Sequence, residues 1–204
     1  MPAPVPAWFV DGQYSWNCFR SVMPSGRIDY AAMRRLIEEH ARAFIDEAYY
    51  FNADWDAGDS GRQDGFNTAI SQPPPRGPGL RPERYWVHRR ALSWPRDMGG
   101  GPVLHPETGE QYQLTIQKAV DVGLAFHLMR SHARRGWHRL YLVAGDADFA
   151  EVITHLVEAE GVELVLMGTG GSLSADLLPL AREVLYFEDF AHDILLAQRH
   201  EETR

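Results

Sequence analysis

The chain has 204 residues, 45% of them hydrophobic, with a formal net charge of −8 and a single cysteine, Cys18. That length is enough for one α/β domain with a sizeable core. A single cysteine excludes an intramolecular disulfide and a cysteine-based zinc site, and it fits a reducing compartment, so we expect the cytoplasm. We find no 18-residue apolar run, which argues against a membrane span. The acidic balance argues weakly against nucleic-acid binding by bulk charge.

Apolar runs and one capping residue predict the elements near the start of the chain. Residues 7–11 are a candidate first strand. A helix is expected after Asp29, whose carboxylate is a typical N-cap, through about residue 43. Residues 44–51 contain an aromatic run that is typical of a strand. These predictions give a strand, a helix and a second strand in succession.

Residues 52–109 differ in character and predict an insertion. They contain runs of three prolines and three glycines, with six arginines and two acids between Arg76 and Asp97. Residues 84–94 favour a strand, and residues 110–116 are placed to pair back with it as a hairpin. So long a segment between regular elements is usually functional or disordered. The segregated arginines suit a polyanion-binding face, and a solvated surface accounts for them equally well.

A regular alternation of elements resumes after residue 116. We expect helices at 116–135, 149–160, 174–180 and 191–200, and strands at 140–144, 162–167 and 184–187. Gly161 stands where a left-handed residue closes the second of these helices. Alternating strands and helices imply right-handed crossovers and a mostly parallel sheet. The predicted fold class is therefore α/β with a mostly parallel sheet, in a single domain (residues 1–204) that carries the insertion.

Four aspartates stand at the ends of these elements. Asp11 ends the first strand, Asp121 lies in the first turn of a predicted helix, and Asp146 and Asp148 follow the apolar strand in LYLVAGDADF, residues 140–149. In open α/β sheets, ligands bind beyond the carboxyl ends of the strands. Carboxylates there predict a site for Mg²⁺ or Mn²⁺, ions that activate water and neutralise charge during phosphodiester hydrolysis. Each acid taken singly also fits a turn or a cap, so the specificity lies in the joint pattern.

Three segments together resemble the NYN-domain branch of the PIN-like ribonucleases. They are residues 7–12, QKAVDVGLAFHLM at 117–129, and the stretch from LYLVAGDADF to residue 168. The most specific parts are the Lys-x-x-Asp at Lys118 and Asp121 and the Gly-Asp-x-Asp-Phe at 145–149. The resemblance covers most of residues 7–51 and 117–187. It implies a Rossmann-like three-layer α/β/α sandwich of the PIN-like type, with acids clustered at one end of the sheet, and divalent-metal-dependent cleavage of RNA.

The resemblance also assigns roles to individual residues. The four aspartates are then the catalytic and metal-binding acids, with Mg²⁺ or Mn²⁺ as the cofactor. Lys118, the only lysine of the chain, joins the catalytic set, where it would contact a phosphate as a point charge. An ordinary exposed helix lysine is the alternative reading. Ser174 matches a serine that the family places after the next strand, and an N-cap role explains it equally well.

One position departs from the family pattern. The family commonly has Asp-x-x-Asn after the first strand, and here the third residue after Asp11 is Tyr14. Asn17 is the nearest asparagine, and it would replace the missing amide in substrate binding if the loop bends back. The departure matters because an amide at this position would orient the metal-bound water or the scissile phosphate.

We expect substrate contacts from the arginine-rich segment as well. Trp86 is flanked by arginines, and aromatic rings stack on the bases of single strands. Arg89 and Arg90 follow it, and a guanidinium binds phosphate oxygens in a bidentate way. The plain alternative for the tryptophan is a packing role, which most tryptophans have.

Three functions are compatible with these observations. The first is a divalent-metal-dependent endoribonuclease. The second is a non-catalytic RNA-binding or regulatory module on the same fold, motivated by Tyr14. A phosphatase is less favoured, because the Asp-Gly-Gln at 11–13 lacks the second aspartate that phosphoaspartate enzymes use as acid and base. We expect single-stranded or structured RNA as the partner and no membrane association, and a homodimer is compatible with the sequence.

Overall fold

The computed structural model describes residues 5–54, 60–117 and 119–196, which form a seven-stranded sheet in the order β4-β3-β2-β1-β5-β6-β7. The six strands from β3 to β7 in that order are parallel, and β4 pairs antiparallel with β3. The strands are β1 (Pro6–Asp11), β2 (Glu47–Asp54), β3 (Arg81–Ala91), β4 (Gln113–Gln117), β5 (Arg139–Val143), β6 (Glu163–Gly168) and β7 (Glu183–Tyr186). The predicted α/β sandwich with a mostly parallel sheet is confirmed.

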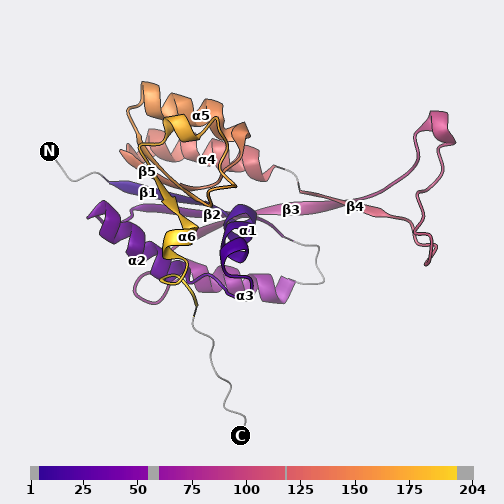
Figure 1. Ribbon diagram of the computed structural model, residues 1–204, viewed down its shortest axis with the longest axis horizontal. Helices are drawn as coiled ribbons and strands as arrows, with labels where there is room; N and C mark the ends of the chain where they lie inside the picture. Colours follow the sequence, from indigo (N-terminus) through magenta and orange to yellow (C-terminus); the bar gives the residue numbers. More distant parts are fainter. Residues whose placement is uncertain (1–4, 55–59, 118, 197–204) are drawn as a thin grey trace, which may run out of the picture.

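Helices cover both faces of this sheet (Figure 1). One face carries α1 (Gly12–Val22), α2 (Tyr30–Ala41), α3 (Ser60–Ser71) and the short α6 (Phe187–Phe190); the other carries α4 (Val120–Arg135) and α5 (Ala150–Thr154). The chain continues from α5 as a π-helical turn, His155–Ala159. Gly161 follows with a φ of 71°, the left-handed conformation that the sequence predicts for it.

The central strand β1 is buried on both faces. Trp8 and Val10 pack in the core beneath α1 and α2, whereas Ala7 and Phe9 pack in the core beneath α4 and α5. All four side chains are fully buried. A strand covered on both sides is apolar throughout, which is why this segment shows no polar alternation. Its first charged residue, Asp11, comes only where the strand leaves the core.

β3 and β4 continue past the sheet as a projecting hairpin, residues 87–117, which we name the arm (Figure 1). β3 pairs with β2 through Trp86 and with β4 from Val87 onward. The predicted hairpin between residues 84–94 and 110–116 is therefore confirmed. The predicted insertion at 52–109 looks different in the structure, because it includes α3 and the first half of β3, which are regular parts of the sandwich.

Several helix predictions need correction. The terminal helix predicted at 191–200 is wrong, because the helix is α6 and turns follow it up to residue 194; residues 197–200 lie outside the described part of the chain. The helix predicted at 174–180 is reduced to turns and a single 3₁₀ turn, Leu178–Leu180. The helix predicted from residue 116 begins only at Val120, since the preceding residues belong to β4. None of the described helices has the length and apolarity that a bilayer crossing requires.

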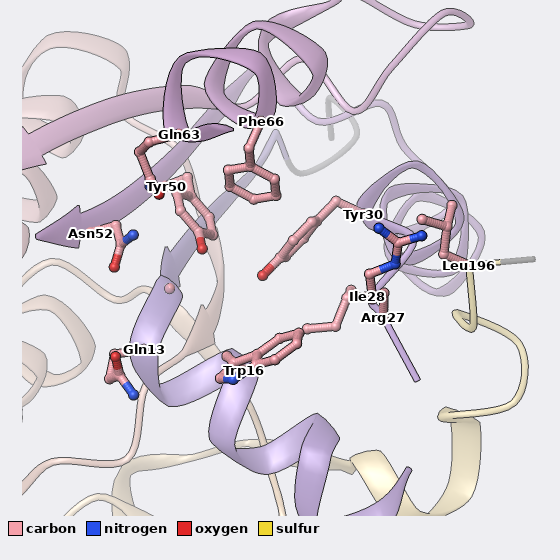
Figure 2. A pocket seen from close by; sticks show the side chains of 11 residues that line it. Gln13, Trp16, Arg27, Ile28, Tyr30, Tyr50, Asn52, Gln63, Phe66 and Leu196 are labelled. Carbon is pink, nitrogen blue, oxygen red and sulfur yellow. The ribbon is translucent and has the colours of Figure 1, made fainter. Parts of the chain in front are cut away.

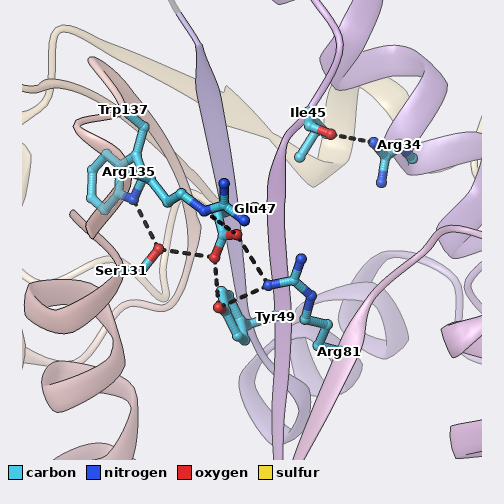
Figure 3. Close-up of polar contacts among 8 residues, drawn as sticks. All are labelled: Arg34, Ile45, Glu47, Tyr49, Arg81, Ser131, Arg135 and Trp137. Carbon is cyan, nitrogen blue, oxygen red and sulfur yellow. Dashed lines mark hydrogen bonds and ion pairs between the residues drawn. The ribbon is translucent and has the colours of Figure 1, made fainter. Parts of the chain in front are cut away.

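A buried carboxylate fixes the amino end of the sheet (Figure 3). Glu47, 2% exposed, forms ion pairs with Arg81 at 3.0 Å and Arg135 at 3.3 Å, and it accepts hydrogen bonds from the hydroxyls of Tyr49 and Ser131. Burial alone would raise the pKa of Glu47, but the Tyr49 and Arg81 contacts outweigh it and the pKa is lowered. This acid is fully neutralised by its neighbours and is therefore structural.

Candidate metal centre at the carboxyl end of the sheet

β1 and β5 are adjacent parallel strands, but the chain continues from them toward opposite edges of the sheet. From β1 the chain passes to β2 and β3 on one side, and from β5 it passes to β6 and β7 on the other. Such a reversal opens a crevice at the carboxyl ends of the two strands, where open α/β sheets bind ligands. Asp11 ends β1, and Asp146 follows β5 closely; Val10 and Val143, near the two strand ends, are paired. The two acids therefore flank the crevice.

Asp11 is held in place as the N-cap of α1. Its side chain accepts a hydrogen bond from the backbone N–H of Tyr14 at 3.0 Å. Burial raises the pKa of Asp11 to about 6, and the negative charges of Asp121 and Asp146 add to the effect, against the lowering influence of the backbone hydrogen bonds. The capping bond fixes the Asp11 side chain, and Asp11 is the least exposed of the four acids.

The other three aspartates are exposed at the same end of the sheet. Asp146 caps the short 3₁₀ turn Ala147–Phe149 by accepting from the backbone N–H of Asp148 at 3.0 Å. Asp121 lies in the first turn of α4, where the helix dipole favours a negative charge. The pKa of Asp121 is nevertheless raised, first by partial desolvation and then by the charges of Asp146 and Asp148. The charges of Asp121 and Asp146 thus act on Asp11, and those of Asp146 and Asp148 act on Asp121.

These charges are not neutralised within the described residues. None of the four aspartates has an ion-pair partner there, although 19 arginines occur in the chain. In residues 5–54, 60–117 and 119–196 no three His, Cys, Asp or Glu side chains converge closely enough to hold a metal ion. The donor set itself, carboxylate oxygens with mutual repulsion, fits a hard divalent cation. Binding would use Asp11 and Asp146 as capping bonds hold them and would require the exposed side chains of Asp121 and Asp148 to turn toward them.

Tyr14 stands where the family commonly has asparagine, and its side chain braces the crevice. Its hydroxyl lies 2.7 Å from Ser172 Oγ, in the loop after β6. A Cβ atom on Gly145 would collide with the Tyr14 ring and the Ser172 carbonyl oxygen, and one on Gly168 with the Tyr14 hydroxyl, so the Tyr14 side chain lies across the carboxyl ends of β5 and β6. Burial raises the pKa of the Tyr14 phenol, so it remains protonated at neutral pH. Tyr14 therefore supplies a fixed wall, not an amide.

Three other predicted site residues, Lys118, Asn17 and Ser174, have different outcomes. Lys118 lies outside the described residues. Asn17 is exposed on α1 and its side-chain oxygen accepts from Gln13 at 3.2 Å, whereas Ser174 lies at the crevice, with its backbone N–H bonded to the Gly145 carbonyl at 2.9 Å. The structure thus brings Ser174, but not the Asn17 amide, into direct contact with the loop that carries Asp146.

The predicted substrate residues of the arginine-rich segment lie on β3. Trp86 ends the part of β3 that pairs with β2, while Arg89 and Arg90 pair with β4 in the arm. Arg90 is exposed. β3 runs parallel to β2 and β1, and the arm includes the carboxyl-terminal part of β3. These positions therefore lie toward the same end of the sheet as the acids.

The sequence did not reveal a pocket of about 370 Å³ next to Asp11, on the face covered by α1, α2 and α3 (Figure 2). We name it the aromatic pocket, because Trp16, Tyr30, Tyr50 and Phe66 line it. These four residues come from α1, α2, β2 and α3. No spacing in the sequence links them, and a single aromatic residue is usually a packing residue. Only the folded chain shows that they share a cavity.

Comparison with known proteins agrees with this geometry. The family model described as NYN domain matches residues 7–188. The crystal structure of VPA0982, a protein of unknown function from Vibrio parahaemolyticus RIMD 2210633, is similar with a TM-score of 0.60 and 18% identity, over 96% of this chain and 99% of that chain. At that identity the likeness shows the fold alone. No protein of curated function matches the chain. The family match spans β1 to β7, and the chain therefore belongs to the NYN-domain family of PIN-like ribonucleases.

Proposed function

We propose that the protein is a divalent-metal-dependent endoribonuclease. One observation carries the proposal: Asp11 and Asp121, at the strand-reversal point, both feel the charges of neighbouring aspartates, and none of the four aspartates has a cationic partner in the described part of the chain. Glu47, the buried acid at the other end of the sheet, is paired with arginines. Carboxylate oxygens without a cationic neighbour are the donors that a hard divalent cation prefers, which supports placing the ion at these four acids.

Asp11, Asp121, Asp146 and Asp148 would hold Mg²⁺ or Mn²⁺. When bound, such an ion lowers the pKa of water and neutralises charge on a phosphodiester under attack. Asp11 contributes a fixed oxygen position, since its capping bond to Tyr14 sets its rotamer. Asp146 is held in the same way by the backbone N–H of Asp148, whereas the exposed Asp121 and Asp148 are proposed to adjust to the ion. Lys118 and Ser174 are proposed to contact the phosphate.

The substrate in this proposal is single-stranded or structured RNA. The arm extends from the carboxyl end of β3 (Figure 1), and Trp86, Arg89 and Arg90 are proposed to bind the strand on its way to the acids. The single cysteine favours a reducing compartment, and we propose the cytoplasm.

A cleavage assay tests the proposal. Fluorescently labelled single-stranded and hairpin RNAs are incubated with the protein in Mg²⁺, in Mn²⁺ or in EDTA, beside Asp146→Asn. Asp46→Asn is a matched control, because Asp46 is exposed immediately before β2, at the opposite end of the sheet. We expect cleavage with either ion by wild type and Asp46→Asn only. Cleavage that persists in EDTA, or in Asp146→Asn, would refute it.

A second candidate function is a non-catalytic RNA-binding module. Its support is Tyr14, which fills the position of the family's amide and lies over Gly145 and Gly168. This reading predicts RNA binding that weakens steeply with salt, without turnover in any divalent cation. Filter binding at 50 and 300 mM salt, run beside the cleavage assay, separates it from the nuclease.

We also propose a homodimer. The outer face of α4 exposes Val122, Phe126 and Met129, the phenylalanine to 59%, at spacings that place them on one side of the helix. Apolar patches of this kind commonly mark protein contacts. Sedimentation velocity should show a dimer for wild type and a monomer for Phe126→Glu; a wild-type monomer at all concentrations would contradict the proposal.

A further inference from the structure

The aromatic pocket has walls suited to a flat aromatic ligand (Figure 2). Tyr30, Tyr50 and Phe66 contact one another edge-on, with ring centroids 5.4–6.1 Å apart and interplanar angles of 63–79°. Tyr30 and Tyr50 are only 7% and 5% exposed, so their positions are fixed by the core. Rings held at such angles form a rigid apolar wall whose faces and edges attract another ring.

Trp16 stands where the pocket opens to solvent. It is 40% exposed, although it lines the cavity, and the Arg20 guanidinium lies over the ring at 5.2 Å from its centroid. A large exposed indole beside an apolar cavity is a stacking platform, because covering it removes apolar surface from water. Arg27, at the pocket's rim, adds a positive charge for a polyanion.

Amide side chains gather on one side of the pocket. Figure 2 shows Gln13, Asn52 and Gln63 on this side, opposite Arg27 and Leu196. Within the described residues the side chains of Asn52 and Gln63 make no hydrogen bond. Each amide offers both donors and an acceptor, the groups that match the hydrogen-bonding edge of a base.

The pocket directly adjoins the acids. Gly12, which lines it, follows Asp11 in the chain, and Phe51, which precedes Asn52, is paired with Asp11 in the sheet. A Cβ on Gly12 would collide with the Tyr50 ring, so the start of α1 lies against the aromatic wall. A ligand bound at Asp11 therefore has the amide side of the pocket as its immediate neighbour.

We propose that the aromatic pocket binds a nucleobase of the RNA strand whose backbone passes the four aspartates. The inference rests on the proposed function, because it takes RNA as the substrate. The base lies against Trp16 and the Tyr30–Tyr50–Phe66 wall, and Asn52 and Gln63 bond its edge. The pocket thus sets which nucleotide lies beside the cleaved bond, whereas the acids determine whether cleavage occurs.

Binding is measured in EDTA, so that cleavage plays no part. The probes are single-stranded RNA hexamers of A, C or U, and a hexamer with one 2-aminopurine, whose fluorescence falls when the base is stacked. The proteins are wild type, Trp16→Ala, Asn52→Ala and, as a control, Phe44→Ala. Phe44 is an 85% exposed aromatic residue near the amino end of β2, away from the pocket. Thermal melting confirms that each variant is folded.

We expect Trp16→Ala to weaken binding of all three hexamers by about 5- to 150-fold, the range for losing one stacked base, and to abolish the quenching. Asn52→Ala should change the order of affinity among A, C and U, which a purely structural defect would not do. Phe44→Ala should match wild type. Equal affinity and quenching in wild type, Trp16→Ala and Phe44→Ala would overturn the pocket proposal.

The two proposals fail separately. Metal-dependent cleavage that requires Asp146, together with unchanged RNA binding by Trp16→Ala, would uphold the nuclease and reject the base pocket. Weakened binding by Trp16→Ala, together with no cleavage by wild type in any cation, would uphold the pocket and reject the nuclease. Absence of RNA binding by wild type in low salt would reject both.

Discussion

Replacing Asp11 by asparagine should stabilise the protein in the absence of metal, although it destroys the proposed site. Asparagine is as good an N-cap as aspartate, so its oxygen can keep the 3.0 Å bond from the backbone N–H of Tyr14. The change removes a half-buried charge that lies close to the charges of Asp121 and Asp146. A carboxyl group whose pKa is raised by the fold costs stability when it is ionised at neutral pH, and such groups cluster at functional sites.

The raised pKa of Asp11 gives the size of this stability change and the pH range over which it appears. Folding raises the pKa of Asp11 from 3.8 to about 6, chiefly through burial. Because the folded state binds this proton more tightly than the unfolded state, the penalty is absent below the unfolded value, grows as pH rises, and is complete above the folded value. This rise in the pKa corresponds to a penalty of about 3 kcal/mol on the free energy of unfolding. Losing the favourable charge at the helix start offsets roughly 0.3–1 kcal/mol of it.

The assay is urea unfolding of wild type and Asp11→Asn in EDTA at several pH values, with Asp46→Asn as the exposed control. At pH 7.5 we expect Asp11→Asn to raise the free energy of unfolding by about 2 kcal/mol, or the melting temperature by roughly 4–8 °C. The gain should shrink below pH 6 and vanish near pH 4. Excess Mn²⁺ should stabilise wild type and close the gap. A destabilised Asp11→Asn protein at pH 7.5, or a gain independent of pH, would refute the reasoning.

Three further predictions concern stability. Gly145→Ala places a Cβ against the Ser172 carbonyl oxygen and the Tyr14 ring, which should lower the free energy of unfolding in urea by about 1–3 kcal/mol; an unchanged unfolding midpoint would contradict this packing. Tyr14→Phe keeps the ring but loses the 2.7 Å bond to Ser172, which should cost about 1 kcal/mol in the same assay, and no loss would mean that the bond is not formed. Glu47→Gln should cost about 1.5–3 kcal/mol at pH 7, because charge-assisted bonds to its arginines weaken. The lowered pKa of Glu47 means that this difference is present above the unfolded value of 4.5 and narrows as pH falls below it; a constant difference would contradict the assignment.

Much of the fold could be predicted from the sequence, because the central strands are buried on both faces. β1, β5 and β6 are continuous apolar runs, and their ends are marked by Asp11, Gly145 and Gly168. Two helices on one face of the sheet are harder to predict from the sequence than these strands. α3, SGRQDGFNTAIS, has two glycines and little apolar periodicity, so its helical conformation depends on tertiary packing of Phe66 and Ile70. α1 likewise begins at Gly12 and is held by its cap and by buried Phe19.

The candidate site likewise has features that could be predicted from the sequence and features that could not. The four aspartates could be chosen from the sequence because strand ends and helix starts are local features. The electrostatic interaction between Asp11 and Asp146 could not be predicted from the sequence. It depends on β1 lying beside β5, and this pairing joins residues far apart in the chain. The position of the Tyr14 ring over Gly145 and Gly168 is non-local for the same reason. The aromatic pocket, built from four separate elements, has no local signal.

The most direct test of the central claim is the single-turnover rate of RNA cleavage, measured with the protein in large excess over a labelled RNA. Under these conditions the rate belongs to the added protein and saturates with its concentration. We expect a rate with Mn²⁺ or Mg²⁺ that is lost in EDTA and falls at least about 100-fold in Asp146→Asn, since even changes outside a metal's direct ligands cost 10–100-fold. Equal rates for wild type and Asp146→Asn, or no cleavage by wild type in either cation, would contradict the assignment of the four aspartates as a catalytic metal centre.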